Sequence, residues 1–481
     1  LMLFILFLYN GIVAINEGIK MTEKELKQEN RKEKMLYEPL PKVITSMAIP
    51  CIVAFLITSI YGIADTYFVS GLGTNATAAV SVNASLDNII MMAGSMVAIG
   101  ANSYIARLLG AKKEDRANRV LSSAFFVAII FGIAVLLLGT IFMEPMVMLL
   151  GATDTCKEYA MQYATYVLLV APFMTANFVM NQCLRSEGAS TRSMIGMGVG
   201  GIINCFLDPL FIIVFDMGVA GASIATAISK LISFAVLIWP YVTKKTILKI
   251  KLKYFRMDWE MIKEVTTIGS SSLFRTGLSI VAAIILNNLA GEYGDSVLAG
   301  IGVTTKIMMF PMGIILGYGQ GFQPVVGYCW GAKNFKRVRE AFNYVLKVAL
   351  AGGVIMAIFL FFTANPLISL FAGEDPMMHE IGALSIRLQG IALCVHAWVV
   401  MVNMMCAGIG DAKNALLLST ARQGTCFIPI VYPLAMFLQA TGVAAAQAVA
   451  DGLTLFLAIP VVKSINKRID AAEAEMNTVA A

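Results

Sequence analysis

Long blocks of apolar residues, separated by short polar connections, run along most of the chain. Stretches such as 124–142, 199–215 and 348–362 contain no Lys, Arg or Glu. A helix rises 1.5 Å per residue, so about 20 apolar residues cross a bilayer core that is about 30 Å thick. The pattern therefore predicts an all-α polytopic membrane protein.

Twelve blocks have the length of a tilted membrane-spanning helix. We place these spans at 44–68, 78–104, 120–141, 158–183, 190–214, 218–242, 262–290, 297–325, 341–362, 381–406, 414–436 and 443–462.

The basic residues test this count. Of the 36 Lys and Arg residues, 29 fall in the terminal segments and alternate connections on one side, whereas only Lys157 falls on the other side. The remaining six lie within spans, namely Lys230, Arg275, Lys306, Lys347, Arg387 and Arg422. Because basic residues remain on the cytoplasmic side, both termini are expected in the cytoplasm.

Composition excludes several classes of protein. The chain is 58% hydrophobic and only 14% charged, which is atypical of a water-soluble domain. The net charge of +6 resides mainly in the short connections, so it indicates topology and not nucleic-acid binding. Eight cysteines form no CxxC motif, the two histidines are far too few for a His-rich metal site, and no phosphate-binding GxxxxGK[ST] loop occurs. We also find no HExxH or GxSG element, so an enzyme is not expected.

The first twenty residues have two interpretations. Residues 1–15 are apolar but lack the basic start and small-residue cleavage site of a signal peptide. We expect Met21 to be the native start, with 1–20 an upstream extension; the alternative is an additional hydrophobic segment.

An internal repeat divides the chain. Residues 100–112 recur at 321–333, an offset of 221, and Asn181 and Gly188 match Asn403 and Gly410 at an offset of 222. Two six-span halves that insert in the same direction are related by an axis along the membrane normal. We therefore expect the following organisation: a cytoplasmic segment at 21–43, an N-lobe at 44–243, a basic cytoplasmic linker at 244–260, a C-lobe at 261–463 and a cytoplasmic tail at 464–481.

Four oxygen-bearing side chains fall at similar depth in three N-lobe spans. They are Asp65, Asn204, Asp208 and Thr226, of which Asn204 and Asp208 share a helix face at i and i+4. An ionised Asp at the centre of a membrane helix costs about 2.5–3.5 kcal/mol on insertion scales, so each needs a partner or a task. Carboxylate, amide and hydroxyl oxygens suit Na⁺, and a close carboxylate pair can hold a proton.

Other charged residues also fall inside the predicted spans. Asp87 in the second span and Asp451 in the last are plausible cavity residues. Arg275 and Lys306 indicate that the C-lobe pairs its charges differently, and the simplest expectation is an ion pair of Asp451 with one of them. Arg422 is expected to extend to the cytoplasmic surface.

Several motifs resemble the multidrug and toxic compound extrusion (MATE) family, in its DinF/MepA-like branch. They are Ala48-Ile-Pro50 with the run 63–73, the Gly110-Ala-Lys loop, Asn204-Cys-Phe-Leu-Asp208-Pro209 and the run 218–226. The resemblance covers 40–463. It implies a cation-coupled antiporter that exports amphipathic, often cationic compounds.

The resemblance also implies roles for individual residues. Positions matched by Asp65, Asn204, Asp208 and Thr226 form the N-lobe cation site of the family. Tyr61 and Asn181 match positions near the drug pocket, and Pro50 matches a proline at which the first helix bends. Some branches carry a coupling glutamate in span 7; this chain has Arg275 nearby and no acid, which argues against a C-lobe cation site.

We therefore expect a twelve-helix exporter of the bacterial inner membrane that works by alternating access, with Na⁺ or H⁺ as coupling ion and no other cofactor. Pro50, Tyr61, Asp87, Asn181, Arg275, Lys306 and Asp451 are candidate pocket or gating residues. The expected partners are membrane lipid and small amphipathic, cationic substrates, and the expected state is a monomer. The alternative is a lipid-linked oligosaccharide flippase of the same superfamily; a passive channel is disfavoured by the repeat.

Overall fold

The structure is a computed structural model that describes residues 34–70, 74–372 and 375–480. The predicted extension 1–20 and most of the segment 21–43 lie outside the described residues. Within the described ranges every regular element is helical. The elements are α3 (Leu40–Ser70), α4 (Thr74–Gly110), α5 (Glu114–Ile141), α6 (Met143–Leu149), α7 (Lys157–Ser186), α8 (Ser190–Pro209), η1 (Leu210–Val214), α9 (Gly218–Val242), η2 (Leu252–Tyr254), α10 (Trp259–Glu292), α11 (Asp295–Gly331), α12 (Phe335–Ala372), α13 (Pro376–Ile409), α14 (Ala412–Thr420), η3 (Ala421–Thr425) and α15 (Phe427–Ala480).

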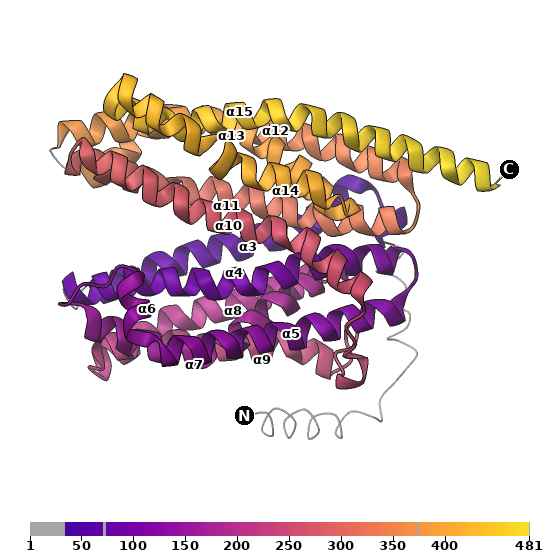
Figure 1. Ribbon diagram of the computed structural model, residues 1–481, viewed down its shortest axis with the longest axis horizontal. Helices are drawn as coiled ribbons and strands as arrows, with labels where there is room; N and C mark the ends of the chain where they lie inside the picture. Colours follow the sequence, from indigo (N-terminus) through magenta and orange to yellow (C-terminus); the bar gives the residue numbers. More distant parts are fainter. Residues whose placement is uncertain (1–33, 71–73, 373–374, 481) are drawn as a thin grey trace.

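Eleven helical stretches in the described ranges are long and apolar enough to cross a membrane. The last of them, Ala412–Thr478, has 67 residues, about 100 Å of helix, which is enough for two crossings. It is broken at Gln439, where φ is 52° and ψ is −135°, and the chain reverses direction there (Figure 1). Predicted spans 414–436 and 443–462 lie on either side of this break, so the chain makes twelve crossings.

The helices form two bundles that lie side by side. Helices α3–α9 make the lower bundle in Figure 1 and α10–α15 the upper one. One cluster of buried apolar side chains is confined to the first bundle, between Val69 and Ala222, and another to the second, between Ala282 and Ala450. The largest cluster combines residues of both bundles, so the two lobes share a core where they meet.

The lobes meet most closely where α4 and α11 end, at the end of the molecule that carries the basic connections 111–113, 243–258 and 332–334. We call this end the basic end. A Cβ atom on Gly110 would overlap the carbonyl oxygen of Tyr328, and one on Gly331 would overlap the carbonyl oxygen of Arg107. The two halves of the sequence repeat thus cross each other reciprocally, and only glycine lets the two backbones approach this closely.

Two further crossings show the same symmetry. Gly317 of α11 packs on the backbone of Ile52 in α3, where a Cβ would lie 2.7 Å from the Ile52 Cα. Gly269 of α10 packs in the same way on the backbone of Met96 in α4. The two crossings are related by 217 residues in the first helix of each lobe (52 to 269) and by 221 in the second (96 to 317). The two lobes therefore use equivalent positions at both crossings.

Ion pairs add to the contact between the lobes at the basic end. Arg107 Nη2 lies 2.7 Å from Glu264 Oε2, and Arg116 Nη2 lies 2.6 Å from Glu260 Oε2. The Ser103 hydroxyl of α4 donates to the Ala407 carbonyl of α13. Because both arginines belong to the N-lobe and both glutamates to α10 of the other bundle, these pairs must break if the bundles separate here.

Candidate functional site

Three of the four predicted cation ligands form one buried hydrogen-bonded cluster. Asn204 Nδ2 donates to Asp208 Oδ1 at 3.0 Å and to Thr226 Oγ1 at 3.4 Å, which joins α8 to α9. All three side chains are buried, and Asp208 has no exposed surface. Among the residues that the structure describes, the Asn204 amide oxygen has no hydrogen-bond donor. It is therefore a buried carbonyl-type oxygen available to a cation.

The local sequence explains how these side chains are placed. A spacing of four residues puts Asn204 and Asp208 on one face of α8. Pro209 follows at once, and its missing N–H interrupts the hydrogen bonding of that turn. The chain continues as the π-helical turn η1, Leu210–Val214. Wider turns of this type occur frequently at functional sites.

The fourth predicted ligand, Asp65, belongs to the last part of α3. Its side chain lies outside the described residues. Its place in the cation cluster therefore stays a prediction.

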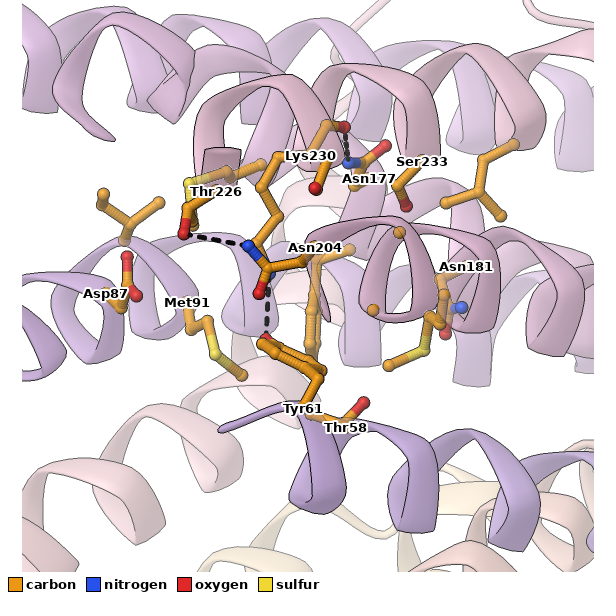
Figure 2. A pocket seen from close by; sticks show the side chains of 18 residues that line it. Thr58, Tyr61, Asp87, Met91, Asn177, Asn181, Asn204, Thr226, Lys230 and Ser233 are labelled. Atoms are coloured by element: carbon orange, nitrogen blue, oxygen red, sulfur yellow. Dashed lines mark hydrogen bonds between the residues drawn. The ribbon is translucent and has the colours of Figure 1, made fainter. Parts of the chain in front are cut away.

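A cavity of about 150 Å³ opens beside this cluster in the N-lobe. Asn204 and Thr226 line it, together with the predicted pocket residues Tyr61, Asp87 and Asn181 (Figure 2). The Oδ1 atom of Asp87 has no hydrogen-bond donor among the described residues. The Asn181 amide donates to the Ser193 carbonyl at 3.1 Å, which fixes its orientation.

The N-lobe cavity also contains a cation that the sequence analysis did not select. Lys230 Nζ of α9 donates to the Tyr61 hydroxyl of α3 at 3.2 Å and lies 5.3 Å from the centre of the Tyr61 ring. Lys230 lies four residues after Thr226, hence on the same helix face. That spacing was the signal that could have identified it.

Two predicted pocket or gating residues lie elsewhere. Pro50 is buried inside α3, which continues as a helix on both sides of it, two residues before the α3–α11 crossing at Ile52. Lys306 of α11 is exposed and lines neither the N-lobe cavity nor the C-lobe cavity described below.

The C-lobe contains a second cavity, of about 450 Å³. Arg275 of α10, His396 and Asn403 of α13, and Arg422 of η3 line it. Asn88 of α4 also reaches it from the N-lobe, whereas the neighbouring Asp87 lines the N-lobe cavity. The two cavities therefore lie on different sides of α4.

The predicted pairing of Asp451 with Arg275 or Lys306 is wrong. Asp451 pairs with Arg422: Nε lies 2.6 Å from Oδ1, and Nη2 lies 3.3 Å from Oδ2. The expectation that Arg422 extends to the cytoplasmic surface fails for the same reason. Asp451 is almost completely buried, and a buried carboxylate without a countercharge is strongly destabilising. Pairing with Asp451 therefore stabilises Arg422 more than contact with solvent would. The π-helical turn η3 and the chain reversal at Gln439 bring the two residues together.

Removing one partner of this pair is expected to destabilise the C-lobe. Asp451→Ala leaves the partly buried Arg422 guanidinium without its carboxylate, at a cost of up to about 3–5 kcal/mol. The midpoint of thermal unfolding in detergent should fall clearly. In the double variant Arg422→Met/Asp451→Leu, which leaves no buried charge of the pair, most of the loss should be recovered. Equal unfolding midpoints for the single and double variants would contradict this account.

The comparisons with known proteins identify the family. The family model described as MatE matches residues 50–210 and 272–433, which together make up more than half of the chain. The chain belongs to the MatE family. The two matched segments begin 222 residues apart, which is the offset of the internal repeat.

Curated relatives of this MatE protein include the multidrug export protein MepA of Staphylococcus saprophyticus, with 27% identity over 446 residues, 90% of this chain and 96% of the relative. MepA of Staphylococcus aureus is 26% identical over 450 residues, 92% of this chain and 99% of the relative.

Solved structures agree with the fold. One is the outward-facing conformation of a multidrug resistance MATE family transporter of the MOP superfamily, with a TM-score of 0.84 and 25% identity; the match covers 92% of this chain and 98% of that one. Another is a MOP superfamily transporter from Pyrococcus furiosus, described with a reversed polarity of its binding pocket, with a TM-score of 0.85, 25% identity and the same coverage. The predicted fold of twelve helices in two bundles is thus confirmed.

The MatE repeat relates the two cavities to each other. At the offset of 222, seven residues of the N-lobe lining correspond to seven of the C-lobe lining. They are 174, 177, 178, 181, 197, 200 and 201 in the N-lobe cavity and 396, 399, 400, 403, 419, 422 and 423 in the C-lobe cavity. At the offset of the first helices, 217, Thr58 corresponds to Arg275. The two cavities are therefore equivalent places in the two lobes.

The cation cluster, in contrast, has no counterpart. The 217 offset relates Asp65 to Ala282, and the 222 offset relates Asn204 to Cys426 and Asp208 to Ile430. None of these C-lobe side chains offers an oxygen ligand. Three of the four predicted cation ligands therefore have no oxygen-bearing counterpart in the C-lobe.

Proposed function

We propose that this protein exports amphipathic organic compounds by antiport with Na⁺ or H⁺. The observation that carries the proposal is the buried Asn204–Asp208–Thr226 cluster beside the N-lobe cavity. The MepA relatives are multidrug export proteins, which supports drugs as substrates and gives no support to the flippase alternative.

The cluster supplies the chemistry that a coupling ion requires. A carboxylate, an amide oxygen and a hydroxyl are hard oxygen ligands suited to Na⁺, and Asp208 can hold a proton instead. Asp65 is proposed as the second carboxylate. Bound Na⁺ or H⁺ neutralises Asp208, and the hydrogen bonds between α8 and α9 then rearrange at the wall of the cavity. An ion that binds one conformation better than the other shifts the equilibrium between them.

The contact between the lobes supports alternating access as the proposed mechanism. The glycine crossings and the pairs Arg107–Glu264 and Arg116–Glu260 close the basic end, and we propose that this is the outward-facing state. Helix α3 connects the two regions, because it carries Tyr61 in the cavity and Ile52 at the crossing with α11. Pro50 lies beside that crossing, so bending at Pro50 would change the cavity and the lobe contact together.

The basic end is proposed to face the cytoplasm, with both termini there, in a bacterial inner membrane. We propose a monomer as the transport unit, because the cavity and cation cluster of the N-lobe and the contact between the lobes all belong to one chain.

Transport by purified protein in liposomes tests the proposal. We expect tetraphenylphosphonium to move against its concentration gradient when either a Na⁺ or a proton gradient of opposite direction is imposed. An ionophore that collapses that gradient should stop the transport. Tetraphenylphosphonium flux that is indifferent to both gradients would contradict cation antiport. Flux that only follows the concentration gradient of tetraphenylphosphonium itself would indicate a passive channel.

A further inference from the structure

The C-lobe cavity is the repeat counterpart of the N-lobe cavity, but its lining carries different charged groups. Positions occupied by Thr58, Met174 and Gly200 in the N-lobe carry Arg275, His396 and Arg422 in the C-lobe. Asn181 and its counterpart Asn403 line both cavities unchanged. The same architecture thus presents one carboxylate (Asp87) and one ammonium group (Lys230) in the N-lobe cavity, and two guanidinium groups in the C-lobe cavity.

Arg275 gives the C-lobe cavity its excess of positive charge. Its guanidinium donates from Nη2 to the Ser272 hydroxyl at 3.5 Å, on the same helix. In the described part of the chain, no carboxylate lies within 4.0 Å of it. A guanidinium near the middle of a membrane-spanning helix costs free energy unless a countercharge or a ligand stabilises it.

The other charges of the cavity do not neutralise Arg275. The Asp451 carboxylate accepts hydrogen bonds from Nε and Nη2 of Arg422 and from the Gln447 amide at 3.4 Å. His396 Nδ1 lies 4.0 Å from the same carboxylate oxygen. With Arg422 and Asp451 cancelling each other, one positive charge remains on the cavity wall.

The rest of the lining suits an organic anion and not a small inorganic one. Met312, Leu316 and Val400 supply apolar surface, while Asn403, Ser419 and Gln423 supply uncharged hydrogen-bonding groups. A volume of about 450 Å³ has room for part of an aromatic compound as well as its charged group. Guanidinium binds a carboxylate with two parallel hydrogen bonds, which gives direction as well as charge.

We propose that the C-lobe cavity is a subsite for the carboxylate of a transported amphiphile, with Arg275 as the group that binds it. This inference rests on the proposed export function and names one group among its substrates, the amphipathic compounds that carry a carboxylate. The Arg422–Asp451 pair positions the neighbouring wall and leaves Arg275 as the charge available to the substrate.

A matched pair of dyes tests the subsite. Rhodamine B carries a free carboxylate, and its ethyl ester has the same fluorophore without that charge. Dissociation constants for both are measured by fluorescence anisotropy on the full chain in detergent. We expect Arg275→Gln to weaken binding of rhodamine B by about 10- to 100-fold and to leave binding of the ester unchanged, because a hydrogen-bonded charge is lost only for the acid.

Two control variants make the result specific. Lys306→Gln removes one positive charge from the same lobe at an exposed position outside the cavity, so it should change binding of neither dye. Arg275→Lys keeps the charge without the two-pronged geometry and should recover part of the rhodamine B affinity. Size-exclusion profiles establish that each variant is folded.

The subsite proposal would be overturned if the wild-type protein bound the ester but not the acid, or bound neither dye. It would also be overturned if Arg275→Gln weakened the affinity for both dyes equally. The export proposal is judged separately, because tetraphenylphosphonium has no carboxylate. Its gradient-driven transport by the wild-type protein decides the export proposal. A wild-type protein that fails to transport tetraphenylphosphonium but shows the expected rhodamine pattern would contradict cation antiport and leave the subsite standing.

Discussion

Asp208→Asn is expected to reduce gradient-driven export of tetraphenylphosphonium by tenfold or more. Asn has nearly the same volume as Asp and keeps an oxygen that accepts the hydrogen bond from Asn204, so the cluster should remain folded. The negative charge is lost, and with it the site for a proton and the strongest ligand for Na⁺. A loss of about 1.4 kcal/mol in ion binding already corresponds to a factor of ten. Initial rates in proteoliposomes with an imposed Na⁺ or proton gradient measure the effect.

Asp216→Asn is the matched control for this experiment. Asp216 is exposed, eight residues further along the chain, and has a φ of 49°, which Asn tolerates better than most residues. The same substitution there should leave export unchanged. Full export by Asp208→Asn would exclude this carboxylate as the coupling group and direct attention to Asp87, the acidic residue that lines the cavity.

Gly331→Ala is expected to prevent full closure of the basic end. The new Cβ would overlap the carbonyl oxygen of Arg107, so α4 and α11 would have to separate, and the nearby Arg107–Glu264 pair would weaken. Overpacking of this kind destabilises a protein by about 1–3 kcal/mol. We expect a lower midpoint of thermal unfolding, slower export, and faster maleimide labelling of the buried Cys329 two residues earlier, measured by peptide mass spectrometry.

Gly302→Ala on the same helix provides the comparison. A Cβ there meets nothing within 4 Å among the described residues, and Ala favours a helix over Gly by up to about 1 kcal/mol. This variant should have unchanged export and an unchanged or higher unfolding midpoint. If Gly331→Ala labels and transports like Gly302→Ala, the glycine crossing does not control closure of the lobes.

The two lobes carry different functional groups at equivalent positions. The C-lobe positions that correspond to Asp65, Asn204 and Asp208 carry Ala282, Cys426 and Ile430, which offer no oxygen ligand. The N-lobe cavity has no guanidinium at the position of Arg275, because the counterpart there is Thr58. A single rearrangement of the lobes could therefore act on a cation and on an organic anion in different places.

Much of the architecture follows from the sequence by itself. Apolar length determines which segments cross a bilayer, the distribution of Lys and Arg predicts their orientation, and the repeated Gly-Ala-Lys motif divides the chain into two parallel halves. The spacing of four between Asn204 and Asp208 also placed their side chains on one helix face, where they hydrogen-bond. These features depend on neighbouring residues, or recur at offsets of 221 and 222 residues, so they can be recognised without the tertiary structure.

Only the tertiary structure decided which charges meet. Sequence gives the depth of a residue along its helix but not the direction in which its side chain points relative to other helices. Asp451 was therefore assigned to Arg275 or Lys306, and Lys230 was not selected, although it binds Tyr61 of another helix. The π-helical turn η3 and the reversal at Gln439 change the rotation and path of the chain between Arg422 and Asp451. Pairing inside a membrane depends on those rotations, because a buried charge is stabilised only by the groups that its own helix face meets.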